Sequence, residues 1–322
     1  MGLRYLRPVA ACVFSAILAL ALAQDAHAQA APAYLALGDS LAFGVGADNP
    51  AAEGYVGLTD FDLKADPRFA DTGLDLINLS APGATSADLV QPDGQLSKGI
   101  AEIQARASDD TAGNEVQIIS LDIGGNDLLA LADSESPCVQ NAGSQACQDK
   151  LTSTLRGLQD NLVSALRQLR EAAPHAEIYV LNLYNPYSGT TGDRALVASV
   201  GVQEVNGVID AVASDPDFGA KLVSVFELFQ GRAAEWIASD GIHPNNNGYR
   251  VMAEALLASI QGRAASLPAD LLNPATPTAI ADPNADSGSG GVDTIVVLIA
   301  LPLVFLAGAT LSATYFVVRG RR

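Results

Sequence analysis

The sequence predicts an α/β fold in which helices cover both faces of a parallel β-sheet, and three patterns support this prediction. Short apolar runs of strand length recur along the chain at 34–37, 74–79, 116–123, 178–183 and 222–226. Between the third and fourth runs, five leucines lie three or four residues apart, as on one helix face: Leu155, Leu158, Leu162, Leu166 and Leu169. The runs are apolar on both faces and are separated by helical patterns, which is typical of buried parallel strands.

Two further helices are expected at 194–212 and 246–262. In sheets of this kind, ligands bind beyond the carboxyl ends of the strands. The segments after the first three strands are LALGDSLAFG, INLSAPGATS and ISLDIGGND, and each contains glycine and polar residues. A fourth such segment, SDGIHPNNNGY, follows the fifth strand and a helical stretch. We therefore expect a site where these four segments meet.

The first 30 residues have the pattern of a secretory signal peptide. Arg4 and Arg7 precede an uncharged apolar run at 9–23, and alanines follow at 26, 28 and 30. Cleavage after Ala28 or Ala30 would leave a globular domain over 31–265, which is enough chain for one well-packed core.

The C-terminal part predicts a tether and a membrane anchor. Residues 266–291 are rich in Pro, Ala, Asp and Gly without periodicity, as in a linker. Residues 292–318 are apolar and long enough to form a transmembrane helix, and 319–322 form a basic tail that should stay cytoplasmic. The protein is thus expected to be exported and anchored at the cell surface, although a similar tail also occurs in proteins that are cut after export.

The charge and the cysteines limit the possible partners. The formal net charge is −18, and such an acidic surface repels nucleic acid, so nucleic-acid binding is excluded. Cys138 and Cys147 are the two cysteines that remain once the predicted leader is removed. In an exported chain they predict one disulfide.

A nucleophilic group can be assembled from these segments. Ser40 follows the first strand, and a serine hydroxyl needs a base before it can attack a substrate. His243 stands three residues after Asp240, with Gly241 between them, so a turn can bring the carboxylate to the ring. Serine, histidine and aspartate would then form a hydrolytic triad. The alternative is a turn that Ser40 or Asp39 caps and a polar surface loop around His243.

Two other segments supply hydrogen-bond donors. The Gly83 N–H is unobstructed by a side chain, and the Asn126 amide can point into a cleft, so both can stabilise an oxyanion. The alternatives are a turn glycine and a capping asparagine. The chain has no G-x-S-x-G, H-E-x-x-H or P-loop motif.

GDSL at 38–41, the glycine at 83, GGND at 124–127 and DGIH at 240–243 occur in the order of the four blocks of the SGNH, or GDSL-type, hydrolase family, which this chain resembles. The resemblance implies a flavodoxin-like α/β/α sandwich with a five-stranded parallel sheet of order 2-1-3-4-5. It implies ester hydrolysis without a metal or cofactor, through an acyl-enzyme. It also implies that Ser40 is the nucleophile, His243 the base and Asp240 the orienting acid. Ser40, Gly83 and Asn126 would form the oxyanion hole.

Several alternatives stay open at the level of sequence. The chain could be a binding or adhesion module on the same fold, or an acyltransferase that uses the same residues. The ester could be a small molecule, a lipid or a polysaccharide, and loops 44–56 and 184–194 are expected to shape the pocket. The segment 282–288 resembles a calcium loop weakly, and the Asn78 glycosylation sequon is expected to be structural.

Overall fold

A computed structural model of the protein describes residues 31–108, 111–267 and 269–272. The signal peptide, the transmembrane helix, the basic tail and the calcium-loop segment that the sequence predicts lie outside these residues, as does most of the linker.

The core of the fold is a five-stranded parallel sheet with the strand order β2-β1-β3-β4-β5. The strands are β1 (Ala33–Gly38), β2 (Asp75–Asn78), β3 (Val116–Asp122), β4 (Glu177–Leu181) and β5 (Ala220–Val223). The predicted fold class and strand order are confirmed. Strand β5 ends earlier than the apolar run at 222–226 because the N–H groups of Val225 and Phe226 donate to the Asn182 side chain instead of the sheet.

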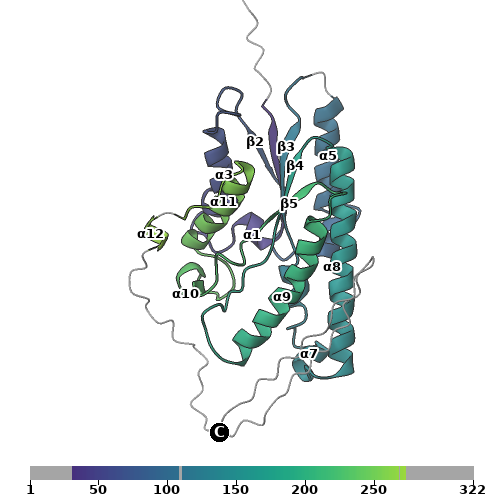
Figure 1. The fold of residues 1–322 in the computed structure, drawn as a ribbon. Helices are drawn as coiled ribbons and strands as arrows, with labels where there is room; N and C mark the ends of the chain where they lie inside the picture. The colour runs from purple at the N-terminus through teal and green to yellow at the C-terminus, as the bar shows by residue number, and fades with distance from the viewer. Residues whose placement is uncertain (1–30, 109–110, 268, 273–322) are drawn as a thin grey trace, which may run out of the picture.

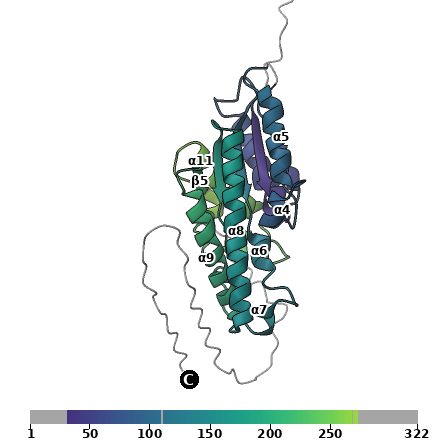
Figure 2. The same ribbon diagram turned by 90° about the vertical axis from the view of Figure 1, so that its right-hand side faces the viewer.

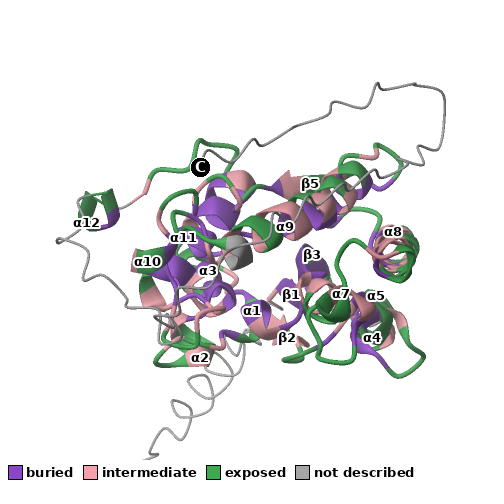
Figure 3. Cartoon of the chain, turned by 90° about the horizontal axis from the view of Figure 1, so that it is seen from below, coloured by how far each residue is buried: buried purple, intermediate pink, exposed green. Residues whose placement is uncertain are grey.

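Helices cover both faces of this sheet (Figures 1 and 2). The helices are α1 (Ser40–Phe43), α2 (Pro50–Glu53), α3 (Tyr55–Lys64), α4 (Ser86–Val90), α5 (Gln95–Ser108), α6 (Gly125–Leu129), α7 (Pro137–Gln140), α8 (Gln145–Ala172), α9 (Asp193–Ala213), α10 (Ala233–Trp236), α11 (Asn246–Ile260) and α12 (Ala269–Leu272). One layer contains α4, α5, α8 and α9, and the other contains α3 and α11. Figure 3 shows the central strands between these two layers.

Alternate residues of each strand enter opposite halves of the core. In β1, Tyr34 and Ala36 pack with α3 and α11, while Leu35 and Leu37 pack with α5 and α8. Four leucines of the predicted stripe on α8 are almost completely buried: Leu158, Leu162, Leu166 and Leu169. These leucines therefore pack α8 against one face of the sheet, as their spacing indicated.

Among the residues that the structure describes, α9 is the one helix long and apolar enough to cross a membrane, over Ala195–Ala213. Its buried side chains Val202, Val205 and Ile209 pack in the same half of the core as α8. These contacts are those of a covering helix in a globular domain.

The chain beyond residue 265 continues to contact the domain. Leu271 of α12 is buried, and its carbonyl accepts a hydrogen bond from Arg232. Asp270 pairs with Arg250 of α11. The chain therefore packs against the domain as far as Leu272, several residues past residue 265, where the sequence analysis ended the globular domain.

The predicted disulfide is present. Cys138 in α7 and Cys147 in the first turn of α8 are joined, with their Cα atoms 4.5 Å apart. The bond closes the segment that leads from α6 into the long helix α8.

Removing this disulfide should lower stability, because an open loop gains conformational freedom in the unfolded chain. For the variant with Cys138→Ser and Cys147→Ser together, we expect a loss of roughly 2–3 kcal/mol in the free energy of unfolding. Urea unfolding with and without dithiothreitol measures it. The reductant should destabilise the wild type and leave the double variant unaffected; equal effects on both proteins would contradict the prediction.

Candidate active site

Ser40 lies at the carboxyl end of β1, in the sharp turn that begins α1. Gly38 has a φ of 153°, and a Cβ atom there would lie 2.3 Å from Oδ1 of Asp122. The buried Gln95 side chain accepts from the Gly38 N–H and donates to its carbonyl, each at 2.8 Å. Asp39 then caps α1 by accepting the Leu41 N–H at 3.0 Å. The Gln95 bonds fix Gly38, and the capping bond fixes Asp39 and Leu41, the residues on either side of Ser40.

Ser40, His243 and Asp240 form a continuous hydrogen-bonded group. Nε2 of His243 lies 2.9 Å from Oγ of Ser40, and Nδ1 of His243 lies 2.6 Å from Oδ2 of Asp240. A ring that bonds a carboxylate through one nitrogen and a hydroxyl through the other has the geometry that activates a serine. The structure thus brings together three residues that the sequence placed in two distant segments.

The Asp240 carboxylate is held by the turn in which it lies. Its Oδ1 accepts the N–H groups of Ile242 at 2.9 Å and His243 at 3.0 Å, and Gly241 between them has a φ of 77°. Partial burial acts to raise the pKa of Asp240, but the hydrogen bonds from the Ile242 N–H, the His243 ring and the His243 N–H lower it below its ordinary value. Asp240 is therefore held in the charged form that can orient an imidazole.

Contacts with other parts of the fold fix the position of the loop that carries His243. The buried Tyr184 hydroxyl donates to the Ile242 carbonyl at 2.6 Å. Pro244 pairs with Ile237 in an isolated bridge. Gly46 has no side chain, and a Cβ atom there would lie 2.9 Å from Cβ of His243. The loop after α1 therefore packs directly against the histidine.

The three predicted oxyanion donors also lie at this edge: Ser40 and Asn126 in the first turns of α1 and α6, and Gly83 in the loop after β2. Within the described chain, the N–H groups of Ser40 and Gly83 donate to no other group. Gly83 has a φ of 81°, a backbone conformation that glycine adopts without strain. The Asn126 amide donates to Ala84 O at 2.9 Å and to Oδ2 of Asp39 at 3.2 Å. An oxyanion would have to replace the Ala84 carbonyl as an acceptor.

Two buried carboxyl groups lie behind Ser40, and the sequence analysis did not assign them to the site. Asp39 and Asp122 are 2% and 1% exposed. Asp122 accepts the Asp39 N–H at 3.0 Å and the Tyr55 hydroxyl at 2.6 Å. Burial, and then the nearby Asp122, raise the pKa of Asp39 well above its ordinary value. Burial also raises the pKa of Asp122 to about 6, although the Tyr55 hydroxyl and the Asp39 N–H act to lower it.

Other candidates lie elsewhere or have structural roles. His175 is exposed, between α8 and the amino end of β4, at the opposite edge of the sheet from Ser40. The Asn78 side chain donates to the Ala42 carbonyl and accepts the Ser80 N–H, as expected of a structural asparagine. In the described part of the chain, no three His, Cys, Asp or Glu side chains form a metal-binding group.

Replacing Asp122 with Asn should change how stability depends on pH. Because its folded pKa of about 6 exceeds the unfolded value of about 3.9, this carboxyl group favours the native state in acid, and its contribution is lost as the pH rises through 6. The free energy of unfolding of Asp122→Asn, relative to the wild type, should therefore rise by roughly 2–3 kcal/mol between pH 4 and 7.

Urea unfolding at a series of pH values measures this difference. Asp71→Asn, which alters an exposed carboxylate, serves as the control and should show a far smaller change with pH. A constant difference between Asp122→Asn and the wild type would contradict the raised pKa.

Several known proteins resemble this chain over the same region. The uncharacterized protein YpmR of Bacillus subtilis is 25% identical over 236 residues, which are 70% of this chain and 80% of YpmR. The spore germination lipase LipC of Bacillus licheniformis is 24% identical over 238 residues, which are 71% of this chain and 97% of LipC. The crystal structure of a lipase from a goat rumen metagenome aligns with a TM-score of 0.54 at 24% identity, covering 71% of this chain and 97% of that lipase. The model of the GDSL-like lipase/acylhydrolase family matches residues 36–251, most of the described domain, and the chain therefore belongs to this family.

Proposed function

We propose that the protein is a serine hydrolase that cleaves carboxylic esters through an acyl-enzyme on Ser40. The observation that carries this proposal is the set of hydrogen bonds that runs from Asp240 through His243 to Ser40. Membership of a lipase and acylhydrolase family supports the same class of reaction.

The proposed reaction uses these three side chains in two steps. In the first, His243 takes the proton of Ser40 as its Oγ attacks the ester carbonyl carbon, and the proton then passes to the leaving alcohol. In the second, His243 takes a proton from water, which attacks the acyl carbon, and the acid leaves as Ser40 regains its proton. Asp240 keeps the ring oriented and stabilises its cation in both steps.

The charge that develops on the carbonyl oxygen needs donors. We assign this role to the N–H groups of Ser40 and Gly83 and to the Asn126 amide. Asp39 would act as a positioning residue, because its Oδ2 accepts from the Asn126 amide at 3.2 Å. That bond leaves the amide anchored on one side when the oxyanion replaces the Ala84 carbonyl on the other.

Two alternatives use the same fold. A binding or adhesion module would have no need of a serine, a histidine and a carboxylate in hydrogen-bonded contact, so the geometry disfavours it. An acyltransferase would share every residue of the first step and differ in the acceptor of the second. Since relatives include lipases, a lipid ester is one candidate substrate and a polysaccharide ester is another.

Ser40→Ala and His243→Ala should each reduce kcat for p-nitrophenyl acetate by roughly 10⁴-fold or more, because each removes a member of one catalytic unit. The double variant should lose little more than either single variant. Initial rates together with circular dichroism test the prediction, and a folded His243→Ala protein with wild-type turnover would refute it.

Two further variants separate the triad from its surroundings. His175→Ala replaces an exposed histidine at the far edge of the sheet and should leave kcat unchanged. Asn126→Ala removes one oxyanion donor and should cost roughly 10²–10³ in kcat, which is less than the loss of the triad residues.

We also propose that the enzyme is exported and held at the cell surface, with a leader at 1–30 and an anchor at 292–318. The basic ends and apolar runs of these two segments support this topology. The full-length protein should fractionate with membranes and be digested by protease added to intact cells. A chain that stops at residue 291 should be soluble and active. Recovery of the full-length protein from the cytosol would contradict the proposal.

A further inference from the structure

Asp127, the last residue of the GGND segment, joins α6 to the start of α4. Its Oδ2 accepts the Ser86 N–H at 2.8 Å, and its Oδ1 accepts the Ser86 hydroxyl at 2.6 Å. Ser86 is completely buried, so its two donors cannot turn to water if the carboxylate is lost. Asn126, the preceding residue, makes a third bond between the same segments, from its amide to the Ala84 carbonyl. These bonds connect the segment that carries Gly83 to the helix that carries Asn126.

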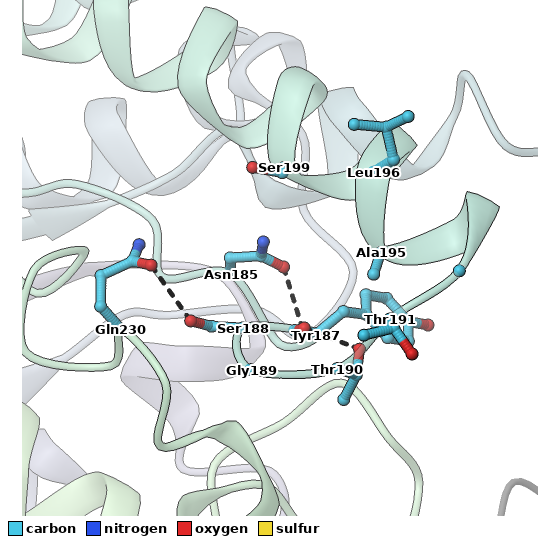
Figure 4. Close-up of a pocket in the computed structure, with 11 residues that line it drawn as sticks. Asn185, Tyr187, Ser188, Gly189, Thr190, Thr191, Ala195, Leu196, Ser199 and Gln230 are labelled. Carbon is cyan, nitrogen blue, oxygen red and sulfur yellow. Dashed lines mark hydrogen bonds between the residues drawn. The ribbon is translucent and has the colours of Figure 1, made fainter. Parts of the chain in front are cut away.

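The position of α6 depends on contacts with the rest of the fold. The helix has five residues, and a helix this short is not stable by itself in water. Three consecutive side chains hold it: Asn126 contacts the segment after β1, Asp127 contacts α4, and Leu128 contacts α9. A Cβ atom on Gly201 of α9, which lies two residues beyond Ser199 in Figure 4, would be 2.8 Å from Cδ1 of Leu128. The placement of the Asn126 amide therefore relies partly on Asp127.

The bond between Asn126 and Ala84 is the one that the proposed reaction would interrupt. The oxyanion would replace the Ala84 carbonyl as an acceptor of the Asn126 amide. Among the hydrogen bonds of the described residues, only the two between Asp127 and Ser86 would then still join these segments. Gly83 lies three residues before Ser86, and Asn126 lies directly before Asp127. The distance between the two oxyanion donors in the transition state would therefore depend on the Asp127 carboxylate.

Helix α8 fixes the other end of this connection. The Asn161 amide of α8 donates to the Ser86 hydroxyl at 3.0 Å. Asn161 lies next to Leu162, which belongs to the buried leucine stripe, so its backbone is firmly held. A serine hydroxyl has one proton and two lone pairs, so that of Ser86 donates to Asp127 while it accepts from Asn161. Both partners thus set the orientation of the Ser86 side chain.

Capping of α4 does not account for the bonds of Asp127, because this helix has a cap of its own. The Thr85 side chain accepts the Asp88 N–H, and the Asp88 carboxylate accepts the N–H and the hydroxyl of Thr85. Asp88 is exposed, and these bonds stay within the first turn of α4. The two carboxylates at this turn therefore differ in role: Asp88 closes the turn, whereas Asp127 connects it to another helix.

We propose that Asp127 is a positioning residue that holds the Gly83 N–H and the Asn126 amide at the separation needed to bind an oxyanion. This inference rests on the proposed esterase function and adds a residue to it. An aligned donor contributes most when charge develops on the carbonyl oxygen. A loss of alignment therefore lowers kcat and kcat/KM together and leaves KM nearly unchanged.

Hydrolysis of p-nitrophenyl acetate by variants of Asp127 tests the proposal. We expect Asp127→Ala to lower kcat by roughly 10–100-fold and to change KM by less than about twofold. Asp127→Asn should retain most of kcat, because its amide oxygen can accept the Ser86 N–H while its NH2 group donates to the Ser86 hydroxyl. Asp88→Ala, the matched control, removes a carboxylate from the same turn and should leave kcat unchanged. Wild-type kcat in Asp127→Ala, or equal losses in Asp127→Ala and Asp88→Ala, would overturn the proposal.

A double-mutant cycle with Asn126→Ala separates positioning from general destabilisation. Once the Asn126 amide is absent, Asp127→Ala should lower kcat by less than about threefold, because there is one donor fewer to align. Losses that multiply, as independent effects do, would overturn the proposal.

Ser86→Ala keeps the test decisive if Asp127→Ala does not fold, as judged by circular dichroism. This variant removes one of the two bonds and should lower kcat by roughly 3–10-fold, whereas wild-type kcat in the folded variant would overturn the proposal. Wild-type protein that does not hydrolyse the ester would reject the esterase function and this role with it. An active wild type whose Asp127 variants match it would reject the positioning role alone.

Discussion

The parallel pairing of β1 with β3 is the constraint on which the site depends. This ladder places Gly38 opposite Asp122, so the turn that presents Ser40 lies beside the loop that carries Asn126. Strands β1 and β3 approach so closely here that a side chain on Gly38 would overlap the Asp122 carboxyl group. Because β1 also pairs with β2, the loop that carries Gly83 reaches the same edge. The two ladders of β1 therefore bring three of the four segments together.

The fourth loop depends on contacts outside the sheet ladder. His243 follows β5, the edge strand, yet its ring reaches Ser40 after the central strand β1. Hydrogen bonds join the segment after His243 to the loop after α1: Asn246 bonds Asp48 in both directions, and the Tyr249 hydroxyl donates to the Val45 carbonyl. The position of the histidine is thus set by the packing of α11 against α3 and by these polar contacts.

The sequence predicted the parts of this molecule that follow local patterns. The leucine stripe of α8, the apolar strands and the order of the four loops are all visible as periodicity or as short motifs. The end of β5 was misplaced because Val225 and Phe226 are apolar but bond to the Asn182 side chain, which is a tertiary contact. The role of Asp122 was also missed, because a carboxyl group at the end of an apolar strand gives no sign of its partners Tyr55 and Asp39 until the strands are paired.

Electrostatics connect the buried acids to the catalytic histidine. Asp39 and Asp122 are held in a region from which water is excluded, and their burial is offset by hydrogen bonds from N–H and O–H donors alone. Burial favours the neutral form of Asp39, whereas Asp122, with a pKa of about 6, is charged above that pH. That charge would stabilise an imidazolium on His243, since Coulomb attraction strengthens as the dielectric falls. The same charge would oppose an anionic substrate and add to the repulsion from the acidic surface.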